Sequence, residues 1–255
     1  MASPRSARSP LDEAALQAVA GPPWTVRLHA EAGSTNALAA AEPMLDLVVV
    51  ADHQQAGRGR LDRDWVTPRG AALTFSAVVD PGVDLEWWPV VPLVTGYAVA
   101  RALGGYAQVK WPNDVLVDGE KVCGILVERV SAQPSVAVIG IGINVDQTAD
   151  ELPVPTATSL HLAGHPVDRT ALFGDVLASL RAALRHFAGH PDLFLNQYRD
   201  RSATLGQEVR VDLPAGHSVE GRVVDFDDHG RLLLRTAAET MTLSAGDVVH
   251  LRPSG

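Results

Sequence analysis

The sequence predicts an α+β protein, in which a large domain with a mainly antiparallel sheet and helices precedes a small β-barrel domain. Three observations support this fold class. Apolar runs and alternating apolar and polar residues cluster at 24–145, with few helical patterns among them. Two helical patterns follow, at 167–187 and 192–199. Short strand patterns then fill residues 208–251, as expected for a small barrel.

Local patterns near the start of the chain predict two helices and two strands. Trp24, Val26 and Leu28 alternate with polar residues, which is typical of a strand. Ser34 or Thr35 is then expected to cap a short alanine-rich helix. The predicted elements are a helix at 11–19, a strand at 24–33, a helix from 34 or 35 to about 42, and a buried strand at 47–51.

The central part of the chain is predicted to form the body of the sheet. Residues 87–103 have the pattern of a core-facing helix, with Pro89 and Pro92 in its first turns. The turn at Asp118-Gly119 is expected to pair the strands on either side of it. The predicted strands are 73–79, 109–111, 115–117, 122–130 and 136–145.

Changes in composition and in the pattern of predicted elements divide the chain into three parts. Residues 1–23 begin with a polar, proline-punctuated stretch and are expected to be a flexible leader. Residues 24–205 form the large domain, and short strands replace helices near Gly206, so residues 206–255 form the small domain. Its predicted strands are 208–213, 218–226, 231–236, 240–243 and 248–251.

Composition restricts the surroundings and partners of the protein. Its 255 residues are 46% hydrophobic, and Cys123 is the single cysteine, so a reducing, cytoplasmic location is expected. No apolar run is long enough for a membrane span. The net charge of −9 disfavours nucleic acid as a partner, although Arg58, Arg60 and Arg63 concentrate positive charge locally. That cluster suits a small anionic ligand.

The most informative segment is DHQQAGRGRLDRDW at residues 52–65. Its glycines let the backbone approach a ligand, and its arginines can bind phosphate or carboxylate oxygens. A solvated surface loop with incidental arginines is an equally good interpretation of GRGR alone.

Three other segments are candidates, each with a plain structural alternative. Residues 33–36, GSTN, could bind a neutral polar group or only cap a helix. Lys110, between Val109 and Trp111, could meet an anionic ligand or be an ordinary exposed charge. Residues 140–144, GIGIN, could offer backbone contacts to a nucleotide or only allow close packing.

Several other chemistries lack their motifs. The sequence contains no GxxxxGK[ST] phosphate loop, no HExxH or paired-cysteine zinc spacing, and no GxSxG nucleophile turn. Residues 140–145 read GxGxxV, without the third small residue of a dinucleotide fingerprint. Neither NAD nor zinc is supported.

Taken together and in order, the motifs resemble those of biotin protein ligases. The matching motifs are GSTN, QQAGRGR followed by RDW, KWPNDV, KVCGILVE and GIGINV, with ATSL and SAGDVVHLR beyond them. The resemblance implies a class II synthetase-like biotin ligase catalytic domain and an SH3-like C-terminal barrel. It also implies a two-step reaction with ATP, biotin and Mg²⁺. Biotin first becomes biotinyl-5'-AMP and then passes to a lysine of a biotin carboxyl carrier domain of an acyl-CoA carboxylase.

The resemblance also implies roles for individual residues. Lys110 matches the lysine between the biotin carboxylate and the α-phosphate, and with Arg58 and Arg60 it would be catalytic. The implied biotin contacts are Ser34, Thr35, Asn36, Gln54, Arg58, Gly59, Arg60 and Lys110. The implied nucleotide contacts are Arg58, Arg60, Arg63, Trp65, Lys110 and Asn144. The resemblance assigns no metal ligands.

Two alternatives to this function remain at this stage. Only 32 residues precede Gly33, fewer than the roughly 60 of the winged helix-turn-helix in some family members. We therefore expect a catalytic-only form that does not bind DNA, and not a biotin-dependent regulator. A lipoate or octanoyl protein ligase is the enzymatic alternative, and the GRGR and KWPND motifs favour biotin.

Overall fold

The computed structural model describes residues 8–60, 63–65, 67–130, 136–214 and 216–251. Its centre is a seven-stranded sheet with strand order β1-β2-β5-β9-β8-β7-β6. Neighbouring strands are antiparallel except for β1 (Thr25–His29) and β2 (Leu47–Ala51), which are parallel because helix α2 (Thr35–Ala41) crosses between them. The α+β class predicted from the sequence is therefore confirmed.

The remaining strands of this sheet carry two of the predicted site segments, Lys110 on β6 and residues 140–144 on β9. They are β5 (Ala72–Val79), β6 (Ala107–Lys110), β7 (Asp114–Val117), β8 (Glu120–Val130) and β9 (Val136–Asn144). Strands β2 and β5 are buried at every position, which identifies the middle of the sheet as covered on both faces. A separate two-stranded ribbon, β3 (Gly57–Arg58) with β4 (Asp64–Trp65), comes from the glycine and arginine loop.

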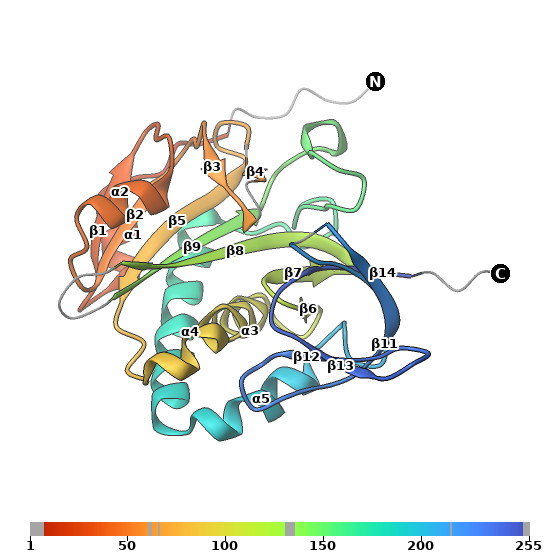
Figure 1. The fold of residues 1–255 in the computed structure, drawn as a ribbon. Helices are drawn as coiled ribbons and strands as arrows, with labels where there is room; N and C mark the ends of the chain where they lie inside the picture. Colours follow the sequence, from red (N-terminus) through yellow and green to blue (C-terminus); the bar gives the residue numbers. More distant parts are fainter. Residues whose placement is uncertain (1–7, 61–62, 66, 131–135, 215, 252–255) are drawn as a thin grey trace.

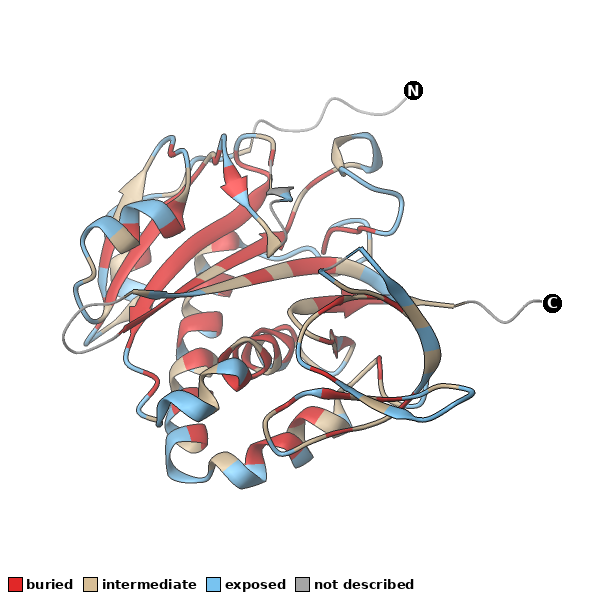
Figure 2. Cartoon of the chain, viewed as in Figure 1, coloured by how far each residue is buried: buried red, intermediate tan, exposed pale blue. Residues whose placement is uncertain are grey.

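Helices α3 (Val91–Leu103) and α4 (Arg169–Gly189) pack together on one side of the sheet, while the β3–β4 ribbon lies on the other (Figure 1). The facing sides of these helices and the central strands are buried (Figure 2). The predicted helix at 87–103 starts differently: Leu85–Val90 is a 3₁₀ helix, and the α-helix begins at Val91. Pro89 lies inside the 3₁₀ turn, because its ring and missing N–H disfavour an α-helix interior.

The N-terminal region differs from the flexible leader expected over residues 1–23. Helix α1 (Glu13–Ala20) forms within it, is capped by Asp12, and packs against α4. Leu16 is fully buried, so the segment contributes to the core and is ordered by that burial. The leader prediction is therefore wrong for residues 8–23, while residues 1–7 lie outside the described chain.

The C-terminal strands form a second, five-stranded antiparallel sheet with order β13-β12-β11-β10-β14. It curves strongly, as expected for a small barrel, although the edge strands β13 and β14 do not pair with each other in the described part (Figure 1). The bounds are β10 (Glu208–Asp212), β11 (Ser218–Phe226), β12 (Leu232–Arg235), β13 (Thr240–Leu243) and β14 (Asp247–His250). Helix α5 (Pro191–Asp200) leads into it.

A turn of the second sheet inserts into the first domain. Trp111 Nε1 donates a 2.9 Å hydrogen bond to the carbonyl oxygen of Gly230. Gly230 has φ +71°, and a Cβ there would lie 2.5 Å from Leu93 Cδ1, so both its conformation and its contact favour glycine. None of the helices in the described ranges combines the length and hydropathy needed to cross a membrane.

Candidate active site

One cavity of about 760 Å³ brings together all the predicted site residues. It is bounded by strands β8 and β9, the β3–β4 ribbon and strand β14. The predicted residues on its wall are Ser34, Thr35, Asn36, Gln54, Arg58, Gly59, Arg60, Arg63, Trp65, Lys110 and Asn144. These residues come from separate parts of the sequence, so the fold supports treating them as one site.

One end of the cavity is a buried network of neutral hydrogen-bonding side chains, which the exposed carboxylate of Glu128 joins at its edge. Ser76 Oγ lies 2.7 Å from Thr35 Oγ1 and 2.6 Å from Asn36 Oδ1. The backbone N–H of Thr35 donates to Gln54 Oε1 at 2.9 Å, and Asn36 Nδ2 donates to Glu128 at 2.6 Å. Each of these side chains is therefore held in one orientation.

Ser76 and Glu128 are functional candidates that the sequence reasoning missed. Ser76 is fully buried within the otherwise apolar run of β5, except for Thr74. A buried hydroxyl needs a partner. A hydroxyl residue within this apolar run was the available signal. Glu128 carried no such signal, because an exposed carboxylate on a strand is ordinary.

The glycines of β8 and β9 make room for protein side chains. A Cβ at Gly140 would lie 2.2 Å from Asn36 Oδ1, and one at Gly142 would lie 2.5 Å from the indole of Trp65. Gly124 pairs with Gly142, and a Cβ there would lie 3.0 Å from the same ring. The glycines of the GIGIN motif therefore make room for Asn36 and Trp65, which is the close-packing alternative considered for this motif.

The β3–β4 ribbon positions Trp65 over this glycine surface. Gly57 pairs with Trp65 across the ribbon, and a Cβ at Gly57 would meet Gln54 Nε2 and the carbonyl of Trp65. Trp65 Nε1 is buried and has no hydrogen-bond partner in the described part of the structure. The ring nitrogen lies on the side that packs against β9, 2.6 Å from a Cβ built at Gly142.

The far end of the cavity is a wall that includes residues 144–157. Asn144 lies four residues beyond Gly140 on β9, which separates the two polar ends by roughly 13 Å at the rise of a β-strand. Asn144 Nδ2 donates to the carbonyl of Thr158 at 3.0 Å, and its Oδ1 accepts from Gln147 at 2.9 Å. The ring of Trp65 packs against Gly142 and therefore lies between the two ends of the cavity.

The three arginines of the cavity wall differ in exposure and in their side-chain partners. Arg63 pairs with Asp247 of β14 at 2.5 Å, although its side chain is 62% exposed. Arg58 is exposed, and the half-buried guanidinium of Arg60 has no hydrogen bond or ion pair to any described residue. Burial lowers the pKa of Arg60, partly offset by the negative charges of Asp114 and Asp247. An anionic ligand would offset that burial further.

Comparison with known proteins identifies the family. Residues 33–146 match the family model described as "Biotin/lipoate A/B protein ligase family", and residues 204–251 match "Biotin protein ligase C terminal domain". The biotin--[acetyl-CoA-carboxylase] ligase of Mycobacterium tuberculosis is 39% identical over 264 residues, covering 96% of this chain and 97% of that protein. This chain belongs to the biotin protein ligase family. It is therefore a ligase enzyme, as the sequence predicted.

Other relatives agree. The biotin protein ligase of Aquifex aeolicus, solved in complex with biotin and ATP, superposes with a TM-score of 0.75 at 28% identity, covering 89% of this chain and 98% of that one. The bifunctional ligase/repressor of Bacillus subtilis is 32% identical over 79% of this chain, and the match covers 65% of that longer protein.

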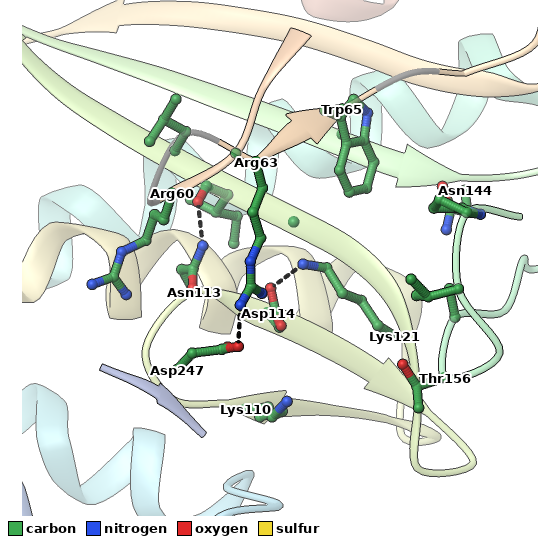
Figure 3. Close-up of a pocket in the computed structure, with 18 of the residues that line it drawn as sticks. Arg60, Arg63, Trp65, Lys110, Asn113, Asp114, Lys121, Asn144, Thr156 and Asp247 are labelled. Carbon is green, nitrogen blue, oxygen red and sulfur yellow. Dashed lines mark hydrogen bonds and ion pairs between the residues drawn. The ribbon is translucent and has the colours of Figure 1, made fainter. Parts of the chain in front are cut away.

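Two lysines of this biotin protein ligase line the cavity, and they lie in different surroundings (Figure 3). Lys121 Nζ lies 2.6 Å from Asp114 Oδ1 and 5.7 Å from the ring centre of Trp65. Lys110, on β6, is close enough to His250 of β14 that its charge, after burial, lowers the pKa of that imidazole. Lys121 thus faces the middle of the cavity, and Lys110 the second sheet.

Sequence reasoning overlooked Lys121. The segment KVCGILVE served only to support the family resemblance, although its lysine precedes Gly124 of the glycine surface by three residues. The available signal was a lysine inside one of the matched motifs, three residues before a glycine.

Proposed function

We propose that this biotin protein ligase joins biotin to ATP as biotinyl-5'-AMP and transfers the biotinyl group to a lysine of a biotin carboxyl carrier domain. The observation that carries this proposal is the single cavity, with a neutral hydrogen-bonding end at Asn36, cations near its middle and a second polar end at Asn144. That order matches the order of ureido ring, carboxylate and nucleotide in the product of the first step.

The neutral end suits the ureido ring of biotin. This ring carries two N–H donors and one carbonyl acceptor but no charge, so hydroxyl and amide groups can satisfy it without an ionic partner. We assign its recognition to Ser34, Thr35, Asn36 and Gln54. Their orientation by Ser76 favours one pose of the ring.

In the first step, a carboxylate oxygen of biotin attacks the α-phosphorus of ATP. The bond from that phosphorus to the bridging oxygen breaks, and pyrophosphate leaves with the electron pair. We assign Arg58, Gly59 and Arg60 to the loop that closes over the carboxylate and phosphate. Fixed cations at this point stabilise the charge that develops as pyrophosphate leaves.

The geometry favours Lys121 over Lys110 as the lysine between the carboxylate and the α-phosphate. Lys121 extends beside Trp65, between the two polar ends of the cavity. Its pairing with Asp114 would be exchanged for ligand oxygens when the substrates bind. Lys110 keeps a proposed role on the β14 side of the site, where its charge could act on the triphosphate.

We assign the nucleotide to Trp65, Arg63 and the Asn144 end. Arg63 must leave Asp247 to reach a triphosphate, which an exposed ion pair allows at small cost. Mg²⁺ is expected to enter with ATP, since it commonly binds one or two carboxylates together with substrate phosphates. Asp114 and Asp247 are carboxylates on the cavity wall from which it would take ligands.

The second step transfers the biotinyl group. The ε-amine of the acceptor lysine attacks the carbonyl carbon of biotinyl-5'-AMP, the bond to the phosphate oxygen breaks, and AMP leaves. An acyl-CoA carboxylase is the proposed owner of the carrier domain. The names of the Mycobacterium tuberculosis and Paracoccus denitrificans relatives, both biotin--[acetyl-CoA-carboxylase] ligases, support this assignment. The net charge of −9 supports a role without DNA.

Purified protein incubated with biotin, ATP and Mg²⁺ tests the function directly. We expect mass spectrometry to detect biotinyl-5'-AMP without an acceptor, and a carrier domain to gain one biotin when it is added. Octanoate and lipoate serve as matched controls for the alternative within the broader family. Preference for either acid, or biotin transfer without ATP, would contradict the proposal.

A further inference from the structure

Arg8 binds the wall at the nucleotide end of the cavity from outside. Its guanidinium donates to both carboxylate oxygens of Glu151, at 3.0 and 2.6 Å. It also donates to the carboxylate of Asp146 at 3.1 Å and to the carbonyl oxygen of Asp146 at 2.7 Å. This hydrogen bonding raises the pKa of Arg8 and lowers that of Glu151 to about 2. The Arg8 side chain is 20% exposed and its two carboxylate partners are somewhat more exposed, so these ion pairs are partly screened by water.

A second set of contacts holds the rest of residues 8–11, which we call the N-terminal strap. Arg169 donates to the carbonyl of Ser9 at 2.5 Å and to Asp52 at 2.9 Å. The backbone N–H of Leu11 donates to the same carboxylate at 3.3 Å. Asp52 is the first residue of the glycine and arginine loop segment. The strap therefore contacts the start of that segment as well as the wall at the nucleotide end. Gly70 leaves room for the strap, because a Cβ at this position would lie 3.0 Å from Arg8 Cβ.

Glu151 connects the strap to the interior of the cavity. It lines the cavity and accepts hydrogen bonds from the backbone N–H and hydroxyl of Thr148, at 2.9 and 3.1 Å. The neighbouring Gln147 is buried and donates to Asn144 Oδ1 at 2.9 Å. A continuous series of contacts therefore runs from Arg8 through Glu151 to the side chain of Asn144.

We propose that Arg8 is a positioning residue for the nucleotide end of the cavity. It touches no substrate itself, but it fixes the turn at residues 146–151 and thereby the orientation of the Asn144 amide. The inference rests on the proposed function, in which this end receives the nucleotide. Among the described residues, the Arg8 side chain forms hydrogen bonds only with Asp146 and Glu151, so loss of Arg8 should affect ATP and leave biotin unaffected.

The chain contains a matched control for this experiment. Arg27 and Glu42 also form a two-pronged ion pair, at 2.6 and 2.8 Å, but neither residue lines the cavity. The variants Arg8→Ala, Arg8→Lys and Arg27→Ala are compared in adenylate formation, with ATP and biotin varied separately. Melting temperatures are measured alongside.

We expect Arg8→Ala to raise the KM for ATP by about tenfold, with the KM for biotin within about twofold of the wild type. Arg8→Lys should recover only part of the loss, because one ammonium cannot reproduce the planar fork that binds Glu151 and Asp146 together. Arg27→Ala should change neither constant. An unchanged KM for ATP in folded Arg8→Ala, or equal rises for ATP and biotin, would overturn the inference.

Two further measurements keep the result decisive. If Arg8→Ala does not fold, Arg8→Lys and Glu151→Gln decide, and both must raise the KM for ATP selectively. If the wild type makes no biotinyl-5'-AMP, the proposed function fails first, and amide hydrogen exchange then tests the strap without substrates. Faster exchange at residues 144–151 in Arg8→Ala or Arg8→Lys supports the positioning role, and equal exchange refutes it.

Discussion

The indole ring of Trp65 occupies the space that a side chain at Gly142 would fill. A Cβ at residue 142 would lie 2.5 Å from Cε2 of the ring, closer than real Cβ contacts allow. Gly142 has no positive φ, so glycine is needed there for space and not for backbone conformation. The position of the aromatic ring in the site is thus determined by a missing methyl group on a neighbouring strand.

Gly142→Ala should therefore push the ring of Trp65 away from β9. We expect adenylate formation to fall by about 10²-fold, the scale on which a small misplacement of a catalytic site acts. Steady-state kinetics measures the loss, and the melting temperature shows whether the fold survives. Gly105→Ala is the control, because a Cβ there would have no neighbour within 4 Å. Equal activity of both variants would show that the ring's position is unimportant.

The two lysines of the cavity make different predictions. Lys121→Ala should lower the rate of adenylate formation by about 10²-fold or more, as expected for loss of one preorganised charge. Lys110→Ala should lower it less, chiefly through the KM for ATP. Single-turnover assays with saturating substrates separate the two effects. If Lys110→Ala abolished the chemical step and Lys121→Ala left it intact, the earlier assignment of Lys110 would be restored.

Arg60 should matter for holding the intermediate more than for making it. Arg60→Gly removes a cation that is half-buried without a described partner, so biotinyl-5'-AMP loses an ionic contact. We expect the variant to form the intermediate but release it at least about tenfold faster, because ion-paired hydrogen bonds are among the strongest available. Rapid filtration measures the release rate, and biotin on lysines of added albumin reports escape. Retention at the wild-type rate would remove Arg60 from this role.

Cys123 should be chemically silent in the folded protein. It is fully buried in β8, and burial raises its pKa, so the reactive thiolate is suppressed. We expect a maleimide reagent to label it only after unfolding in denaturant. Cys123→Ala should stay active and lose about 1 kcal/mol of stability, as for a small buried group. Rapid labelling under native conditions would contradict this expectation.

The bond between Arg8 and Glu151 should depend on pH in a defined range. The side-chain hydrogen bond from Arg8 lowers the pKa of Glu151 from its usual 4.5 to about 2. The pair therefore stabilises the folded protein fully above about pH 4.5 and loses its contribution as the pH falls toward 2. We expect the difference in melting temperature between wild type and Arg8→Ala to be constant near neutral pH and to shrink below about pH 4. A difference that is undiminished at about pH 3 would contradict this coupling.

Local patterns predicted most of the fold. The strands at 47–51, 218–226 and 240–243 have the predicted bounds, because alternation and apolar runs are local properties. The strap was missed because Arg8 meets partners 138 and 143 positions away, which no local pattern reveals. Burial of Leu16 orders the same region through contacts with α4, another distant element.

The site was predicted as a set of residues but not in its internal arrangement. Ordered motifs identified the cavity wall, yet they could not tell which lysine faces its middle. Strands β7 and β8 shift register between Val115 and Leu116, and a shift of one residue changes the face on which side chains point. Lys121 pairs with Leu116, so it lies at the edge of this irregularity. Sequence alternation alone does not detect such a bulge.

The hydrogen bond from Trp111 to Gly230 bears on how this enzyme could be rebuilt from parts. Trp111 directly follows Lys110, which lines the cavity. One short segment therefore borders the site and also forms a hydrogen bond with a turn of the second sheet. A chimera that exchanges the C-terminal sheet with that of a relative would need a compatible turn at residues 227–231. Without such a turn, the chimera would have a buried indole N–H without an acceptor directly beside the cavity.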